Sequence, residues 1–409
     1  MFNALNYNDD VMDYKKNFPI FKNNPGMVFL DNGASSQKPQ SVIDGVSDFV
    51  ANDYANIHRG QYELSERSEH AYEQSKEAVA RLLHCKATEV IYTYNSTHGI
   101  NLLAGTLVRS KILQAGDVVL LSIWEHHANV LPWQILAEQF GFEVRFFDIN
   151  DDYTIDWNDF DEKYDERVKV VSCSHVSNVT GQIYDMKAIK SKLRDDTFFM
   201  IDGSQSVPHF AVNVSDIDCD ALVFTGHKMM AYTGIGVAYL KKDRIKKLSP
   251  MMAGGGTVSD VSISTHTLTF GTSKFEAGTP NIIGAVSLLK AIQYIESIGG
   301  IDQVRLHEKK LVEASLKRFK QLAGRVTLIG SFDGKQRIGV FSFVINKEAN
   351  FNTIGEAFAA ENIAIRCGGH CAYPLHKQLG LGGTCRMSTY VYNDEQDLER
   401  FFGFLENIT

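Results

Sequence analysis

The chain has 409 residues, of which 44% are hydrophobic and 22% charged, enough apolar material for two or three packed domains. Its 49 acidic residues outnumber 41 basic ones, and the net charge of −8 argues against nucleic acid or an anionic membrane as the main partner. Six cysteines are too few for a disulfide scaffold, and no stretch approaches the roughly 20 apolar residues of a membrane span. Because the N-terminus also lacks the basic and apolar segments of a signal peptide, we expect a cytoplasmic protein.

Short apolar runs alternate with helical stretches through the first 280 residues. The runs lack a period of two, as strands buried on both faces do, and they lie at 89–94, 117–122, 143–149, 168–176, 198–202 and 221–225. Helical spacing predicts helices over 63–84, 97–110, 130–140 and 186–194, the first with Leu64, Ala71, Ala78 and Leu82 inward. This repetition predicts an α/β fold with a large, doubly wound and mainly parallel sheet. Ligands should gather at the carboxyl ends of its strands.

The pattern changes after about residue 280. We expect a long helical region over 281–322, a helix near 351–361 and a closing helix from Asp394. Strands are expected at 326–329, 340–345, 363–366 and 384–392. The prediction is an N-terminal arm over 1–25 that packs with the small domain, a large domain over 26–280, and a smaller α+β domain over 281–409.

One lysine, Lys228, follows the strand-like run 221–225 in the sequence TGHK. A lysine held at the carboxyl edge of a sheet can lose its proton on burial and form a Schiff base, although an ordinary exposed lysine is the alternative. Asp202 ends the run 198–202, and a carboxylate at that depth needs a cationic or hydrogen-bonding partner. A pyridinium nitrogen would satisfy it and would make pyridoxal 5'-phosphate an electron sink. Strand-end aspartates also bind metals or cap helices.

A phosphate site should accompany such a cofactor. The segment NSTHG at 95–99 joins a strand to a helix and places the Ser96 and Thr97 hydroxyls at the helix N-terminus, where an anion is favoured. Simple capping of the helix by Ser96 or Thr97 is the alternative.

These motifs make the sequence recognisable. It resembles the class V, fold-type I pyridoxal-phosphate enzymes, and among them the SufS-type cysteine desulfurases and selenocysteine lyases. The resemblance spans nearly the whole chain. Its ordered motifs lie at 29–35, 56–60, 125–129, 175–181, 202–205, 225–228, 275–281 and 366–374.

The resemblance implies roles for residues around the cofactor ring. Lys228 would carry the cofactor, Asp202 would pair with the pyridine nitrogen, and Gln205 would hydrogen-bond the ring oxygen. His126 would stack on the ring and shuttle protons, unless it makes only local contacts at a helix start, a role that His127 could share.

The remaining implied roles concern the phosphate and the substrate. Thr97, Thr225 and His227 would hold the phosphate, and Thr279 would reach the phosphate of the other subunit in a homodimer. The substrate would be bound by Asn178, Arg386, Arg366 and His58. Asn178 would also contact the cofactor. Arg386 would grip the α-carboxylate with both guanidinium nitrogens. No metal is expected.

Cys371 indicates which reaction is performed, since the fold alone does not. It lies in the segment 366–374, RCGGHCAYP, a glycine-rich loop after a strand, where the cation Arg366 would favour its thiolate. Three alternatives remain: a buried core cysteine, a metal ligand together with Cys367 and His370, or a disulfide with Cys367.

The resemblance implies a desulfurase. Lys228 would remove the α-proton of L-cysteine, and Cys371 would attack the substrate sulfur and keep it as a persulfide, releasing L-alanine. The persulfide would pass to an acceptor protein of the SufE or SufU type for iron–sulfur cluster assembly. Selenocysteine lyase, another class V reaction (kynureninase-like, epimerase-like or aminotransferase) and a scaffold without turnover are alternatives. A scaffold would leave Lys228 and Asp202 without a purpose.

The sequence departs from the family pattern at two places. Ala231 and Tyr232 stand where relatives commonly have a glycine-proline pair, so the loop beside Lys228 could differ in shape. Cys367 and Gly369 replace a common threonine and histidine. Cys367 could intercept the persulfide, or it could be a tolerated small residue.

Overall fold

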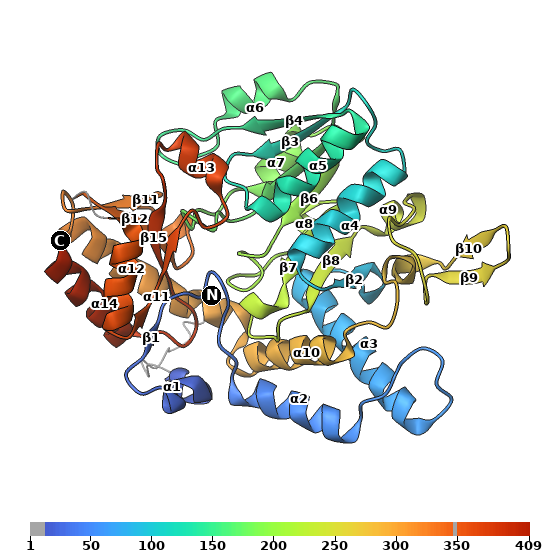
Figure 1. Ribbon diagram of the computed structural model, residues 1–409, viewed down its shortest axis with the longest axis horizontal. Coiled ribbons are helices and arrows are strands. Elements are labelled where there is room, and N and C mark those ends of the chain that lie inside the picture. The colour runs from blue at the N-terminus through green and yellow to red at the C-terminus, as the bar shows by residue number, and fades with distance from the viewer. Residues whose placement is uncertain (1–12, 347–349) are drawn as a thin grey trace, which may run out of the picture.

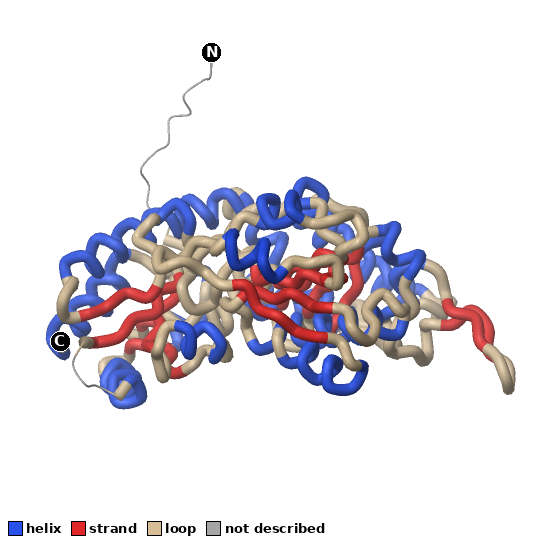
Figure 2. Tube along the Cα trace, turned by 90° about the horizontal axis from the view of Figure 1, so that it is seen from above, coloured by secondary structure: helices blue, strands red, loops and turns tan. Residues whose placement is uncertain are grey.

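The computed structural model describes residues 13–346 and 350–409, so the first twelve residues of the expected arm lie outside it. Figure 2 shows two sheets side by side along the long axis, each covered by helices, with a β-hairpin projecting at the end opposite the C-terminus. The hairpin, β9 (Val258–Val261) and β10 (His266–Leu268), was not predicted from the sequence.

The larger sheet has seven strands in the order β2-β8-β7-β6-β5-β3-β4, and only β8 runs antiparallel to its neighbours. The predicted doubly wound, mainly parallel α/β sheet is therefore confirmed. The strands are β2 (Val90–Thr93), β3 (Val118–Ser122), β4 (Glu143–Phe147), β5 (Val168–Ser174), β6 (Phe198–Asp202), β7 (Ala221–Thr225) and β8 (Gly236–Leu240).

Helices cover both faces of this sheet. Successive strand residues point to opposite sides, so the apolar strands present a hydrophobic surface on each face. Phe199 and Ile201 belong to one core cluster, whereas Met200 belongs to the other. The helices are α2 (Gln40–Asn52), α3 (Glu63–Leu83), α4 (Ser96–Arg109), α5 (Leu131–Phe140), α6 (Trp157–Lys163), α7 (Met186–Lys192), α8 (Val214–Ile217), α9 (Lys242–Lys247) and α10 (Ile282–Ser297).

The buried face of α3 differs from the predicted one. Only Ala78 of the four expected inward residues is buried; Leu64, Ala71 and Leu82 are half-buried. The helix instead turns a largely polar face inward, including Ser65, Ser68, Tyr72 and Ser75. Their hydroxyls form hydrogen bonds there, which offset the cost of removing these polar groups from water.

The smaller sheet is antiparallel, in the order β11-β12-β15-β14. The predicted strand 363–366 is two strands: β13 pairs with β1 near the N-terminus, and β14 pairs with β15. The elements of this lobe are α1 (Pro19–Asn23), β1 (Val28–Phe29), α11 (Gly300–Gln321), β11 (Val326–Ile329), β12 (Val340–Ile345), α12 (Phe351–Ala360), β13 (Ile363–Ala364), β14 (Arg366–Gly368), α13 (Tyr373–Gln378), β15 (Thr384–Ser388) and α14 (Glu395–Ile408).

The long helical region expected over 281–322 breaks at Gly299, whose φ of +103° a side chain would oppose. Helix α10 packs against α2 and α3 of the large lobe, whereas α11 packs on β11 and α14. The change from the large lobe to the small lobe therefore falls between α10 and α11, and not at the expected boundary near residue 281. Among the described helices, no single one is long and apolar enough to cross a membrane. Among these helices, only α10 and α11 taken together meet the combined requirement of length and apolar composition, and they are bent by 70° to each other.

Candidate active site

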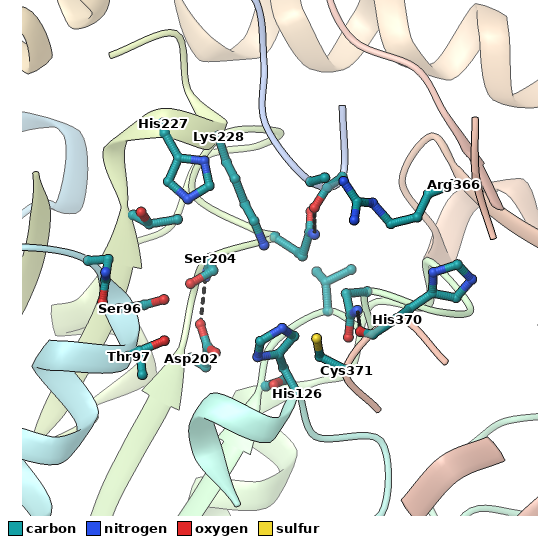
Figure 3. A pocket seen from close by; sticks show the side chains of 18 of the residues that line it. Ser96, Thr97, His126, Asp202, Ser204, His227, Lys228, Arg366, His370 and Cys371 are labelled. Atoms are coloured by element: carbon teal, nitrogen blue, oxygen red, sulfur yellow. Dashed lines mark hydrogen bonds between the residues drawn. The ribbon is translucent and has the colours of Figure 1, made fainter. Parts of the chain in front are cut away.

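A cavity of about 350 Å³ opens at the carboxyl ends of β5, β6 and β7, where the two lobes meet (Figure 3). Every site residue predicted from the sequence lines it except His58 and Thr279. Its walls come from both lobes: Gly33, Ala34, Asn95, Ser96, Thr97, His126, Ser174, Val176, Asn178, Asp202, Ser204, Gln205, Thr225, His227, Lys228, Arg366, His370, Cys371 and Arg386.

Lys228 ends a short 3-10 turn, Gly226–Lys228, that directly follows β7, and its amine points into the cavity. Burial lowers the pKa of Lys228 to about 8, and the attraction of Asp202 only partly offsets this effect. Asp202 is buried at the end of β6 and accepts a 2.9 Å hydrogen bond from the backbone N–H of Ser204. The neighbouring strand ends therefore present an easily neutralised amine and a carboxylate to the same space.

Ser96 and Thr97 lie in the first turn of α4, but neither caps this helix. The cap is Asn95, whose side-chain oxygen accepts from the backbone N–H of His98 at 2.8 Å. The capping alternative for Ser96 and Thr97 is therefore wrong. Both hydroxyls line the cavity at a helix N-terminus, an arrangement that suits a phosphate.

Several buried polar atoms around the cavity have no hydrogen-bond partner: Ser204 Oγ, Gln205 Oε1, Thr225 Oγ1 and His227 Nδ1. Buried polar atoms are almost always satisfied, so orphaned atoms at one cavity indicate that a polar ligand completes them. Hydroxyl and imidazole groups suit a phosphate, and the Gln205 amide suits a ring substituent. These residues fit pyridoxal 5'-phosphate.

The His126 ring has a defined orientation. The backbone N–H of Ala128 donates to its Nδ1 at 3.1 Å, so the neutral ring carries its proton on Nε2. Burial, together with the charge of Lys228, lowers the pKa of His126 to about 3. A neutral imidazole with one N–H donor therefore lines the cavity.

Glu125 stabilises the turn that carries His126, a role that was not predicted from the sequence. Its fully buried carboxylate accepts hydrogen bonds from Ser122, from the Asn129 side chain, and from both the backbone N–H and the hydroxyl of Ser174. Burial raises the pKa of Glu125 to about 7. The carboxylate ties the ends of β3 and β5 to the turn that carries His126.

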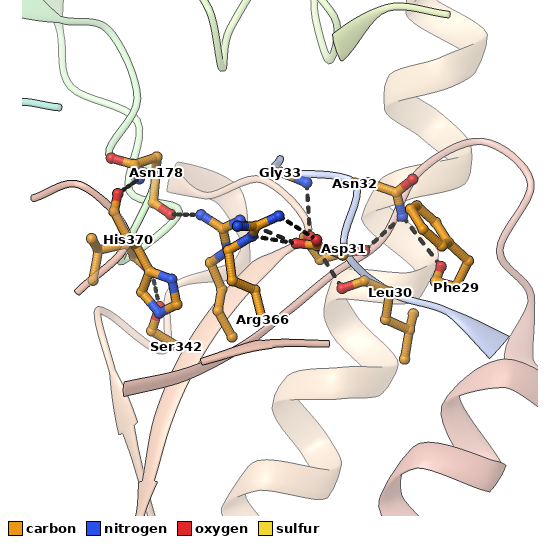
Figure 4. A network of polar contacts seen from close by, with 12 residues as sticks. Phe29, Leu30, Asp31, Asn32, Gly33, Asn178, Ser342, Arg366 and His370 are labelled. Atoms are coloured by element: carbon orange, nitrogen blue, oxygen red, sulfur yellow. Dashed lines mark hydrogen bonds and ion pairs between the residues drawn. The ribbon is translucent and has the colours of Figure 1, made fainter. Parts of the chain in front are cut away.

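Two arginines of the small sheet, Arg366 and Arg386, line the cavity and contact Asp31. Figure 4 shows Arg366 beside Asp31. Arg366 pairs with both carboxylate oxygens of Asp31, at 3.1 and 2.8 Å, and Arg386 lies 3.4 Å from the same group. Arg386 also donates to the Asn178 carbonyl at 2.9 Å and is buried, which lowers its pKa to about 10. Its Nε has no partner, so it retains a donor for an anionic ligand. Asp31 was missed, although it lies in the motif at 29–35.

Cys371 lies on a turn with unusual backbone. Gly368, His370 and Cys371 all have positive φ, at 123°, 48° and 54°. The thiol is exposed and lines the cavity, so the core alternative is wrong. All six cysteines are free, and the described residues contain no group of three or more side chains that could hold a metal ion, which also argues against the disulfide and metal alternatives.

The large lobe holds this turn through His127 and Asn178. The backbone N–H of His127 donates to the Cys371 carbonyl at 2.7 Å, and its Nε2 accepts from the Tyr373 N–H at 3.1 Å. The Asn178 side chain donates to the His370 carbonyl at 2.8 Å. His127 thus positions the thiol, a role that the sequence did not reveal.

His58 and Thr279 lie outside the cavity. The His58 ring is half-exposed and contacts Glu69 at 3.2 Å, and Thr279 is exposed. Within residues 13–346 and 350–409, neither residue lines the cavity that holds the reacting groups. Their implied roles stay predictions.

The departure beside Lys228 is accommodated locally. Ala231 keeps a negative φ, so a glycine is not required there. The backbone N–H of Tyr232, which a proline would lack, donates to Ser287 of α10 at 3.0 Å. The altered pair therefore replaces a rigid proline by a hydrogen bond.

Comparison with known proteins gives consistent relatives. The model of the aminotransferase class-V family matches residues 28–401. A probable cysteine desulfurase of Halalkalibacterium halodurans is 36% identical over 399 residues, covering 96% of this chain and 97% of that protein.

Two solved structures share the fold over nearly their full length. The apo structure of a cysteine desulfurase from Thermococcus onnurineus NA1 matches with a TM-score of 0.91 at 35% identity, covering 97% of both chains. The Escherichia coli cysteine desulfurase CsdA matches with a TM-score of 0.88 at 29% identity, covering 96% of this chain and 97% of that one.

Proposed function

The chain belongs to the aminotransferase class-V family, and from this premise we propose that it is a pyridoxal-phosphate-dependent cysteine desulfurase that converts L-cysteine to L-alanine. The observation that carries the proposal is the meeting of two groups in one cavity. Lys228 and Asp202 come from the large sheet, and the exposed thiol of Cys371 comes from the small lobe. Other class V reactions need the first pair but have no use for the thiol.

Different residues around the cavity would bind different parts of the cofactor. Ser96, Thr97, Thr225 and His227 would bind its phosphate, Asp202 its ring nitrogen, and Gln205 its ring oxygen. Asn178 and His126 would contact the ring as well. When bound, the cofactor supplies an electron sink that makes the substrate α-proton acidic.

The chain's own groups then act on the substrate. Arg386, assisted by Arg366, binds the α-carboxylate through paired N–H donors. Neutral Lys228 takes and returns the proton at the substrate Cα, and its lowered pKa makes the neutral amine accessible near pH 8. His126 offers its Nε2 proton within the cavity. Burial and the charge of Lys228 lower its pKa to about 3, so the ring of the unliganded cavity is neutral and its Nε2–H is a hydrogen-bond donor.

Cys371 completes the reaction as the nucleophile. Its thiolate attacks the substrate sulfur, the bond between that sulfur and the substrate Cβ breaks, and a persulfide remains on Cys371. The bond electrons stay with the carbon fragment, which takes up protons and leaves as L-alanine. Cys371 lines the cavity from a turn in which its own φ is 54°.

We also propose a homodimer and a protein acceptor. The hairpin exposes Val261 and Ile263, and Phe270 beyond it is 93% exposed; apolar side chains in one projecting element favour burial against a second copy. Thr279 would then reach the partner's phosphate. The persulfide would pass to an acceptor of the SufE or SufU type and feed iron–sulfur cluster assembly in the cytoplasm.

The test is alanine and sulfide formation from L-cysteine by the wild type and Cys371→Ala. The variant should keep the visible absorption of the bound cofactor and lose sulfide release by about 100-fold or more. Sulfide release from cysteine at the wild-type rate would contradict the persulfide step. Activity of the variant on selenocysteine would not, since selenium can leave without a nucleophile.

A further inference from the structure

Two cysteines of the small sheet lie directly opposite each other on neighbouring strands. Strands β14 and β15 pair in antiparallel register with Cys367 opposite Cys385, and their Sγ atoms lie 3.1 Å apart. The pair faces α12: Cys385 Sγ is 3.6 Å from the Phe351 carbonyl oxygen, and a Cβ on Gly355 would lie 3.0 Å from Cys367 Sγ. Because alternate strand residues face opposite ways, the pair lies on the other side of the sheet from the arginines of the cavity.

This geometry suits a disulfide. Directly opposed residues of an antiparallel sheet have Cα atoms roughly 4.5–5.5 Å apart, within the range that a disulfide spans. We propose that Cys367 and Cys385 form a reversible, redox-active disulfide and that this bond restrains the segment carrying Cys371. The catalytic thiol is not part of the bond.

The two thiols differ as an attacking and a resolving cysteine should. Cys367 is half-buried and reachable, whereas Cys385 is 1% exposed. The hydrogen bond between them lowers the pKa of Cys367 and raises that of Cys385. Cys367 is therefore the thiol that reacts first with an incoming oxidant.

A low-molecular-weight disulfide of the glutathione type supplies the oxidising equivalents. The Cys367 thiolate attacks one sulfur of this disulfide and releases one thiolate, leaving a mixed disulfide on the protein. Cys385 then loses its proton, attacks the Cys367 sulfur and expels the second thiolate. In total the two protein thiols lose two electrons and two protons, and the small disulfide becomes two thiols.

The position of the bond determines its effect. Cys367 follows Arg366, which lies opposite Arg386 in the same register and lines the cavity. It precedes Gly368, where β14 ends and the turn to Cys371 begins with a φ of 123°. A covalent bond at this point fixes both strands and removes freedom at the base of the turn. The disulfide itself does not depend on the proposed function, whereas its effect on turnover does.

The experiment treats the purified holoenzyme with excess glutathione disulfide and then alkylates the remaining thiols. We expect disulfide formation to lower the protein mass by about 2 Da before alkylation, a peptide linking Cys367 to Cys385 after it, and reversal by dithiothreitol. Amide hydrogen exchange in residues 366–373 should slow about threefold on oxidation. Turnover of L-cysteine should fall by about the same factor.

Matched variants locate the effect. Cys385→Ser should abolish the linked peptide and the change in exchange, and so should Cys367→Thr, which introduces the residue common in relatives. Cys85→Ser removes a half-buried thiol that has no described contact with another thiol, and it should leave the response intact.

Two results would overturn the inference: failure of the Cys367–Cys385 peptide to form under excess glutathione disulfide, or its formation with unchanged exchange in 366–373. Inactivity of the reduced enzyme, with the disulfide and the exchange change still present, would instead count against the proposed function alone.

Discussion

The two halves of the cavity are built in opposite ways. On the cofactor side, Asp202 and Thr225 end buried strands in the middle of a seven-stranded sheet, and neither is more than 6% exposed. On the other side, Cys371 is exposed on a turn with left-handed backbone, held by a few hydrogen bonds from His127 and Asn178. The first half is fixed by the topology of the sheet, whereas the second depends on a few contacts made by a turn.

The largest expected effect breaks the fixed half. Lys228→Ala should remove the visible absorption of bound cofactor and reduce alanine formation by about 10⁴-fold, because both the covalent attachment and the proton carrier are lost. Lys38→Met is the matched control: burial also lowers the pKa of Lys38 to about 8, but this lysine does not line the cavity. The control should keep the cofactor absorption. Loss of absorption in both variants would mean that burial, rather than position, distinguishes Lys228.

The second prediction concerns the boundary between the halves. Arg386→Lys keeps the charge but loses paired donation to a carboxylate, so kcat/KM for L-cysteine should fall about 100-fold. Arg366→Lys should cost about tenfold or less, because the Arg366 side chain is 48% exposed and water screens its interaction. Steady-state kinetics measure both effects. Equal losses in the two variants would contradict the assignment of the substrate carboxylate to Arg386.

The same contrast explains what the sequence could reveal. Apolar runs that end in a polar residue predicted β6 and β7, and parallel strands necessarily bring Asp202 and Lys228 to one edge of the sheet. Contacts between distant segments carry no such signal: Asp31 meets Arg366 across 335 residues of chain. The family resemblance supplied Cys371 and Arg386, but the role of His127 depends on a turn whose docking no local pattern encodes.

Strand register was equally out of reach of the sequence. The spacing of Cys367 and Cys371 suggested a relation between those two, yet Cys367 lies opposite Cys385 instead. One residue of slip between β14 and β15 would have turned either thiol to the other face of the sheet. His58 and Thr279 are the opposite case. Their places in family motifs predicted a role at the site, but neither residue lines the cavity of the described chain.

The third prediction removes a contact that holds the Cys371 turn. His127→Phe keeps an aromatic ring but cannot accept from the Tyr373 N–H, so persulfide formation on Cys371 should slow about tenfold. His127→Gln places an amide oxygen near the position of Nε2 and should restore most of the rate. Quenched-flow trapping of the persulfide measures the step. If phenylalanine and glutamine are equally slow, while the cofactor absorption is unchanged, the hydrogen bond does not position the thiol.

The smallest effect returns to the fixed half and depends on pH. Only the neutral amine of Lys228 can react with the cofactor aldehyde, and its pKa of about 8 means that the neutral fraction rises about fivefold between pH 7 and pH 8. The rate of cofactor uptake by the cofactor-free enzyme should therefore rise with pH and level off above about pH 9. An ordinary lysine, with a pKa near 10.5, would give a rate that still climbs steeply there.

The sign of a neighbouring charge makes this last measurement specific. Asp202 raises the pKa of Lys228 by attraction, so Asp202→Asn should move the half-maximal rate to a pH below 8 rather than above it. Stopped-flow absorbance of the two cofactor-free proteins, both carrying Cys371→Ala to remove the competing thiol, gives the comparison. A shift to higher pH would mean that Asp202 does not face the amine across the cavity. A downward shift ties the two strand ends together electrostatically, as a site built into the centre of a sheet requires.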